Sequence, residues 1–142
     1  MFFLSTESSF DAAHFLKDYV GKCSNLHGHR WRVKAEVMGK ELSKEKQTLG
    51  MLVDFGDVKK DLKSVCDALD HTLIYEAGSL GQATLAALGE EGFRMNEFPF
   101  RPTAENLALY ICGKMQEKGY CVKRVEVYET PTNCAAYEPD LT

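Results

Sequence analysis

Three of the four histidines in this chain lie near a cysteine, early in the sequence. Cys23 is followed four residues later by His27, a glycine and His29, and His14 precedes them. Because side chains in a β-strand repeat their direction every two residues, His27 and His29 can direct two imidazoles to one point. A third nitrogen from a neighbouring strand would complete the three protein ligands typical of catalytic zinc, with a fourth position left for water or substrate. The pattern predicts that His14, His27 and His29 bind a zinc ion.

The alternative for these histidines is a structural or solvent-exposed role, which is the commoner fate of an isolated histidine. Residues 27–37 alternate between apolar and polar types, and this alternation predicts a half-buried antiparallel strand whose apolar face carries both histidines. The residues on that face are His27, His29, Trp31, Val33, Ala35 and Val37. A strand over residues 2–14 would bring His14 beside them if the two strands pair.

Cys23 lies in a polar loop expected over residues 16–25, so a core thiol is the weaker interpretation. It is either a fourth zinc ligand or a catalytic base or nucleophile. A thiol acts as a base only in its thiolate form, which a neighbouring cation such as a metal ion favours. The pattern alone does not separate a ligand from a catalyst.

Asp70 directly precedes His71. A carboxylate beside a histidine can fix its tautomer and raise its basicity, which would suit an acid–base pair. The alternative is an ordinary helix end with a histidine near the negative end of the helix dipole, and the pattern alone slightly favours it.

Glu129 is in phase with Val125 and Val127 of a strand expected over residues 120–129. A buried carboxylate is costly unless it is paired. Glu129 therefore either forms an ion pair with a lysine or arginine, or accepts two N–H groups from the planar edge of a ligand.

Two amphipathic helices are expected in the middle of the chain. The first begins after Asp54, which can cap it, and ends near residue 70; the second begins after Thr103 and ends before Gly119. Glu105 lies in the first turn of the second helix, where a negative charge is favourable.

Residues 76–98 are predicted to hold a short helix over residues 80–88, followed by an extended segment over 93–100. A last short strand is expected over 134–137. Because strands are grouped at the ends of the chain and helices in the middle, the order indicates an α+β fold with an antiparallel sheet and helices on one face.

The composition is that of a globular protein. The chain has 142 residues, of which 44% are hydrophobic and 27% charged, so we expect one domain over residues 1–142. A net charge of −4 without a basic run argues against nucleic acid as a partner. There is no apolar run long enough to cross a membrane, and five scattered cysteines without a C-x-x-C fit free thiols. We therefore expect a cytoplasmic protein.

Six motifs, in one order and covering nearly the whole chain, resemble the 6-pyruvoyl-tetrahydropterin synthase family. They are Phe10-Asp11-Ala12-Ala13-His14, Cys23-x-x-x-His27-Gly28-His29, Val53-Asp54-Phe55, Leu69-Asp70-His71, Pro102-Thr103-Ala104-Glu105-Asn106 and Tyr128-Glu129-Thr130. The short gap between Cys23 and His27 resembles the bacterial branch that forms 6-carboxy-5,6,7,8-tetrahydropterin in queuosine and 7-deazapurine biosynthesis. The pyruvoyl-forming branch usually has a longer gap.

This resemblance implies the tunnelling fold, or T-fold. Each subunit would contribute a four-stranded antiparallel sheet with two helices packed on one face. Sheets would join between subunits into a barrel, commonly as a trimer that stacks into a hexamer. Such a homo-oligomer would give partners to the exposed edges of the sheet.

The resemblance also implies a reaction and the residues for it. The substrate would be 7,8-dihydroneopterin triphosphate, and the products 6-carboxytetrahydropterin, acetaldehyde and triphosphate. Internal redox between side chain and ring would need no nicotinamide or flavin, and the chain has no glycine-rich dinucleotide loop. The implied roles are zinc binding by His14, His27 and His29, proton transfer by Cys23 assisted by Asp70 and His71 of a neighbouring subunit, and pterin binding by Glu129 with Glu105 and Thr103 nearby.

Two other functions stay open at this point: a pyruvoyl-forming synthase that only eliminates triphosphate, and a zinc-binding T-fold protein without turnover. Residues 76–98 form a longer segment than in many short bacterial relatives, and they could reshape the pocket or a subunit contact. The cations available for the triphosphate are Lys17, Lys22, Arg30 and Arg101, and the sequence does not rank them.

Overall fold

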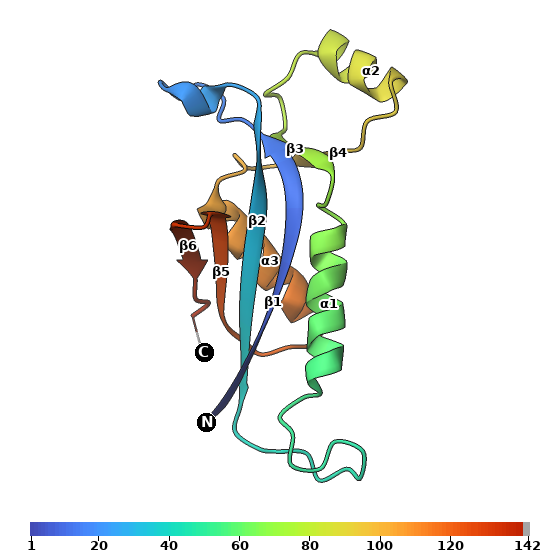
Figure 1. Cartoon of the computed structure of the whole chain (residues 1–142), viewed down its shortest axis with the longest axis vertical. Helices are drawn as coiled ribbons and strands as arrows, with labels where there is room; N and C mark the ends of the chain where they lie inside the picture. Colours follow the sequence, from blue (N-terminus) through green and yellow to red (C-terminus); the bar gives the residue numbers. More distant parts are fainter. Residues whose placement is uncertain (141–142) are drawn as a thin grey trace.

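The computed structural model describes residues 1–140, and its central element is a six-stranded sheet with the order β4-β3-β1-β2-β5-β6 (Figure 1). The strands are β1 Phe2–His14, β2 His27–Gly39, β3 Thr72–Glu76, β4 Met95–Phe98, β5 Val122–Thr130 and β6 Asn133–Tyr137. The helices are α1 Phe55–Asp67, α2 Gln82–Glu90 and α3 Ala104–Glu117, with a 3-10 turn η1 at Lys22–Ser24.

The two long strands at the centre of the sheet confirm the alternation seen in the sequence. β1 and β2 pair antiparallel along their whole length, from Phe2 opposite Gly39 to His14 opposite His27. The face that carries Phe10 and Trp31 is buried, because every second residue points into the core. The histidines therefore lie at the end of the core-facing side.

The helices α1 and α3 cover that face and begin at the predicted caps. The side chain of Asp54 accepts a hydrogen bond from the Gly56 amide at 2.7 Å, and Thr103 Oγ1 accepts one from the Asn106 amide at 3.2 Å. Gly119 follows α3 with φ of +96°, the left-handed conformation that glycine tolerates best. One hydrophobic core joins both helices to the sheet through Val58, Leu62, Val65, Cys66, Leu107, Ala108, Ile111 and Met115.

The first helix ends earlier than the sequence suggested. α1 stops at Asp67, and the amides of Leu69 and Asp70 both bond the Cys66 carbonyl in the following turn. Thr72 Oγ1 then donates to the Leu69 carbonyl at 2.6 Å. The chain leaves the helix before Asp70, so the pair that follows belongs to a loop.

The expectation of a four-stranded antiparallel sheet is wrong, because residues 1–140 form six strands in a mixed sheet; of their three helices, α1 and α3 are the two that pack on one face. β3 runs parallel to β1, and β4 runs parallel to β3 after a crossover through α2. β3 has five residues and β4 four, too few for a two-residue period to be recognised. The helix expected over 80–88 and the extended segment over 93–100 correspond to α2 and β4.

The helix α2 differs from the other two because it does not cover the sheet. It has no buried residue, and Figure 1 shows it standing beyond the ends of β3 and β4. No helix in the described part of the chain is long and apolar enough to cross a membrane. The strands β4 and β6 form the two edges of the sheet, and their pairing with other subunits stays a prediction.

Candidate functional site

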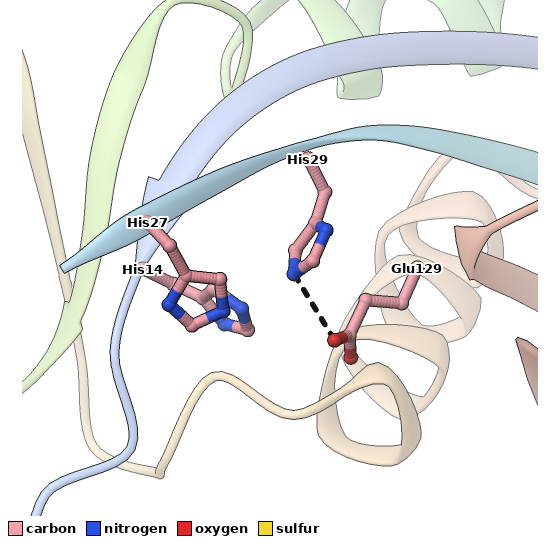
Figure 2. A group of neighbouring side chains, drawn as sticks. All are labelled: His14, His27, His29 and Glu129. Carbon is pink, nitrogen blue, oxygen red and sulfur yellow. Dashed lines mark ion pairs between the residues drawn. The ribbon is translucent and has the colours of Figure 1, made fainter. Parts of the chain in front are cut away.

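The three histidines predicted to bind metal converge at one end of the core-facing side of the sheet (Figure 2). The imidazole centroids of His14 and His27 are 4.5 Å apart, those of His14 and His29 5.1 Å, and those of His27 and His29 4.9 Å. One nitrogen from each ring and a carboxylate oxygen of Glu129 all lie within 4.8 Å of one another. The register that pairs β1 with β2 produces this cluster, because it sets His14 directly opposite His27.

The hydrogen bonds of the His14 and His27 rings leave their inward-facing nitrogens free. Nδ1 of His14 lies 2.8 Å from the Pro102 carbonyl oxygen, and Nδ1 of His27 lies 2.6 Å from that of Asn25. Since a carbonyl oxygen only accepts, Nδ1 carries the proton in both rings and Nε2 keeps its lone pair. The Nε2 atoms of His14 and His27 are buried without a hydrogen-bond partner among the described residues, and that of His29 is buried beside the carboxylate of Glu129.

Burial favours the neutral form of the His14 and His29 rings. His14 is 1% exposed, and burial, with a smaller contribution from the neighbouring His27 and His29, lowers its pKa to about 4 despite the Pro102 carbonyl. The pKa of His29 is also lowered, mainly by burial, although Glu129 opposes the shift. Neutral imidazoles are the form that binds metal.

The donor set fits a divalent metal such as zinc. The buried lone pairs on Nε2 of His14 and His27, which lie close to Nε2 of His29, are costly unless something binds them. Imidazole nitrogens suit zinc, and ligating histidines characteristically donate their other ring N–H to a carbonyl or carboxylate, as His14 and His27 do here.

Glu129 borders the same cluster from β5. Its Oε1 lies 3.0 Å from His29 Nε2, and its side chain is 29% exposed. The pairing of β5 with β6 is irregular between Tyr128 and Thr130. Irregularities of this kind change the direction of a side chain and are common next to active sites. Of the two roles left open by the sequence, a lysine or arginine partner is not seen among residues 1–140; the partner there is His29.

Cys23 borders the histidines without joining them. A cavity of about 610 Å³ is lined by Lys22, Cys23, Asn25, His27, His29, Glu129, Thr130 and Asn133. Within the described chain, the Cys23 sulfur is not one of the atoms that cluster within 4.8 Å. The thiol therefore shares the cavity of the predicted metal site, while the fourth potential ligand atom in the cluster belongs to Glu129.

Asp70 and His71 form a tight pair elsewhere. His71 Nδ1 donates to Asp70 Oδ2 at 2.8 Å, and the other oxygen of Asp70 accepts the Asp11 amide at 2.8 Å. These two hydrogen bonds, that from Asp11 first, lower the pKa of Asp70. His71 is held in the left-handed region, φ 55°, by its own amide donating to the Asp11 carbonyl at 2.6 Å.

His71 borders a different cavity from the one that contains Cys23. This second cavity has a volume of about 580 Å³, and Ala13 and Gly28 line it beside His71. Their positions alternate with those of His14, His27 and His29 along the strands, although His29 borders this cavity as well. His71 is 76% exposed, which leaves its Nε2 available to another molecule.

Thr103 and Glu105 lie at the start of α3. The hydroxyl of Thr103 caps the helix, and the preceding residue, Pro102, supplies the carbonyl that holds His14. Glu105 is exposed in the first turn. Neither side chain lines the cavity with Cys23, and their roles toward a ligand stay predictions.

Three contributions to the site were missed in the sequence. The carbonyls of Asn25 and Pro102 fix two imidazoles, and Trp31, fully buried, packs edge-on against His14 at 4.9 Å and His29 at 5.3 Å. A backbone carbonyl has no side-chain signature. The signal for Trp31 was its phase with His29, two residues earlier in the strand.

The fold is similar to that of pterin synthases of known structure. A 6-pyruvoyl tetrahydropterin synthase from Caenorhabditis elegans matches with a TM-score of 0.67 and 25% identity over 98% of this chain and 96% of that one. One from Plasmodium vivax matches with a TM-score of 0.70 and 21% identity over 98% of both chains. An uncharacterized protein from Wolinella succinogenes matches with a TM-score of 0.79 and 20% identity over 98% of both.

Sequence comparison gives the family. The family model described as 6-pyruvoyl tetrahydropterin synthase matches residues 3–140, so the chain belongs to this family. A protein from Haemophilus influenzae named 6-carboxy-5,6,7,8-tetrahydropterin synthase is 35% identical over 97% of this chain and 99% of its own length. A Synechocystis protein of the same name is 34% identical over 96% of this chain and 93% of its own length.

The metal-free protein is expected to lose stability as the pH falls from about 6.5 to about 4. The folded-state pKa of His14 is about 4, whereas an unfolded histidine has a pKa of about 6.5. Between these values the unfolded chain binds more protons, so the free energy of unfolding decreases, on the order of 3 kcal/mol in total from this residue. Urea unfolding in the presence of a chelator, repeated at several pH values, measures the free energy of unfolding and its dependence on pH.

The matched controls for this pH dependence are His14→Gln and His71→Gln. The first removes the buried titrating group, and its stability should depend less on pH across the window. The second removes an exposed histidine outside the buried cluster, and it shows how much a histidine change away from that cluster alters the slope. A wild-type slope no steeper than that of His14→Gln would contradict the prediction.

Proposed function

We propose that this protein is a zinc-dependent lyase that converts 7,8-dihydroneopterin triphosphate to 6-carboxy-5,6,7,8-tetrahydropterin, with release of acetaldehyde and triphosphate, in queuosine and 7-deazapurine biosynthesis. One water supplies the second oxygen of the new carboxyl group. The names of the relatives from Haemophilus influenzae and Synechocystis support this product.

The observation that carries the proposal is the shared cavity of about 610 Å³. It brings two predicted metal ligands, His27 and His29, together with the thiol of Cys23 and the carboxylate of Glu129. A metal site, a base and an acceptor for ring N–H groups are what elimination from a pterin side chain requires. A volume of this size also suits a small-molecule ligand.

His14, His27 and His29 would hold the zinc ion through their Nε2 atoms. When bound, the ion supplies a Lewis acid that polarises the hydroxyl oxygens of the substrate side chain. The carbonyls of Pro102 and Asn25 keep the rings in the required tautomer.

Cys23 would take a proton from the side-chain carbon of the substrate. His71 would assist this transfer through its free Nε2, with Asp70 holding the opposite nitrogen as a proton donor. Because His71 and Cys23 border different cavities of one subunit, we propose that a homo-oligomer, a trimer or a hexamer of two trimers, brings His71 of one subunit to Cys23 of another.

Glu129 would orient the pterin by accepting its amino and ring N–H groups, with Thr103 and Glu105 near the ring. A carboxylate that accepts two parallel N–H groups gives both strength and direction. His29 Nε2 lies 3.0 Å from the Glu129 carboxylate. In the zinc-loaded protein this nitrogen would give its lone pair to the metal.

An acetaldehyde assay tests the proposal. Purified protein loaded with zinc is incubated with dihydroneopterin triphosphate, and acetaldehyde and the pterin product are measured. The proposed reaction yields one acetaldehyde for each carboxypterin. A pyruvoyl product without acetaldehyde would favour the second candidate, the activity named in the family description; zinc binding without any turnover would favour a binding protein.

Glu129→Gln is expected to weaken pterin binding about tenfold to a hundredfold, because it loses a charge-assisted pair of hydrogen bonds. Zinc content should stay at the wild-type level. Calorimetry with dihydroneopterin and metal analysis measure the two quantities. Glu126→Gln is the matched control, because Glu126 pairs with Arg124 instead and should leave pterin affinity unchanged. Loss of zinc in Glu129→Gln would identify Glu129 as a metal ligand.

A further inference from the structure

The cavity that contains Cys23 also contains a lysine. Lys22 lines this cavity, and among the described residues no other lysine or arginine does. Lys22 lies in η1 and Glu129 at the end of β5, so the cavity is bordered by an ammonium and a carboxylate from different elements. The two groups suit opposite parts of a ligand: N–H donors at the carboxylate and an anion at the ammonium.

The Lys22 ammonium lacks a carboxylate partner. Within residues 1–140, no aspartate or glutamate forms an ion pair with it. An ammonium in the cavity that His27 and His29 line would repel a divalent ion bound by these imidazoles. A ligand with several negative charges would offset this repulsion.

None of the other three cations that the sequence offered lines this cavity. Arg30 donates to both carboxylate oxygens of Asp11, at 2.9 and 3.0 Å. Arg101 donates to the backbone carbonyl of Lys17. Lys17 lines another cavity, together with Tyr19 and without any of the three histidines.

Hydrogen bonds fix the backbone of Lys22 relative to the metal site. Its carbonyl accepts the amide of Asn25 at 3.1 Å and the side-chain Nδ2 of Asn25 at 3.0 Å. The carbonyl of Asn25 in turn accepts from His27 Nδ1 at 2.6 Å. The Lys22 backbone is thus two hydrogen-bonded steps from a predicted metal ligand, while its four-carbon side chain can still adjust to the ligand.

We propose that Lys22 binds the polyphosphate of the substrate and stabilises the negative charge that it gains on leaving. This inference rests on the proposed function. In the elimination, the bond between the terminal side-chain carbon and the ester oxygen breaks, and its electron pair leaves on that oxygen with the triphosphate. The ammonium of Lys22 is placed to offset the charge that develops there. The pterin ring then lies toward Glu129 and the phosphates toward Lys22.

Lys22→Met separates phosphate recognition from structure, because it keeps the length of the side chain and removes the charge. Its KM for dihydroneopterin triphosphate is expected to rise about tenfold to a hundredfold, and the Ki of inorganic triphosphate should rise in parallel. The Kd of dihydroneopterin, which has no phosphate, should stay within about twofold of the wild type. Zinc content should not change.

Lys17→Met is the matched control, since it removes the same charge from the neighbouring loop outside this cavity. Unchanged KM and Ki in Lys22→Met, or equal weakening of dihydroneopterin and its triphosphate, would overturn the proposal. Calorimetry keeps the test independent of turnover. If the wild type binds inorganic triphosphate but forms no product, the proposed function fails, and the affinity of Lys22→Met for triphosphate still decides the role of Lys22.

Discussion

Cys23→Ala is expected to lower kcat about a hundredfold to ten-thousandfold, the usual contribution of a group that transfers a proton. Zinc content should stay at the wild-type level, because the thiol lines the cavity but lies outside the cluster of four close ligand atoms. Metal analysis and the acetaldehyde assay on the same preparation measure both quantities.

Two variants make this result specific. Cys121→Ala removes an exposed thiol outside the cavity and should leave kcat unchanged. His27→Ala removes a predicted ligand and should lose both zinc and activity. If Cys23→Ala loses zinc as His27→Ala does, the thiol is a ligand and its catalytic role is wrong.

The sequence predicted the parts of the fold that carry long, regular patterns. β1 and β2 have thirteen residues each, so their alternation could be recognised, and it placed all three histidines on the correct face. The caps Asp54 and Thr103 located α1 and α3. Residues close together in the sequence determine strand alternation and helix caps, so both can be predicted without the structure.

The parts that could not be predicted depend on contacts between distant segments. β3 joins the sheet through two residue pairs, Ala12 with Thr72 and Ala13 with Leu73, and no local pattern specifies that pairing. The ranking of the cations likewise required the folded chain, because only the structure shows Arg30 on Asp11 and Lys22 in the cavity.

The Asp70–His71 pair shows how the two kinds of information combine. The sequence suggested an acid–base pair but slightly favoured an ordinary helix end. The structure ends α1 before the pair and places His71 in a left-handed conformation held by Asp11. Such a conformation costs on the order of 1–3 kcal/mol, and conformations of this kind cluster at functional sites.

His71→Ala is therefore expected to lower kcat about a hundredfold to ten-thousandfold, with zinc content and pterin affinity unchanged. The side chain is exposed and holds no part of the core, so the fold should be unaffected. His71→Gln, which retains a polar side chain without an imidazole, should be as inactive as His71→Ala. A change at the nearby Asn96 is not a suitable control, because the Asn96 side chain donates hydrogen bonds to Thr72 and to the Ala68 carbonyl.

Co-expression of Cys23→Ala with His71→Ala subunits tests whether the pair acts on a neighbouring subunit. If each site combines Cys23 of one subunit with His71 of another, random assembly of a homo-oligomer restores about one quarter of the sites. If both groups of a site came from one chain, every site in the mixture would carry one defect and activity would stay at the level of the separate variants. Because His71 and Cys23 border different cavities within one subunit, we expect the activity to be restored.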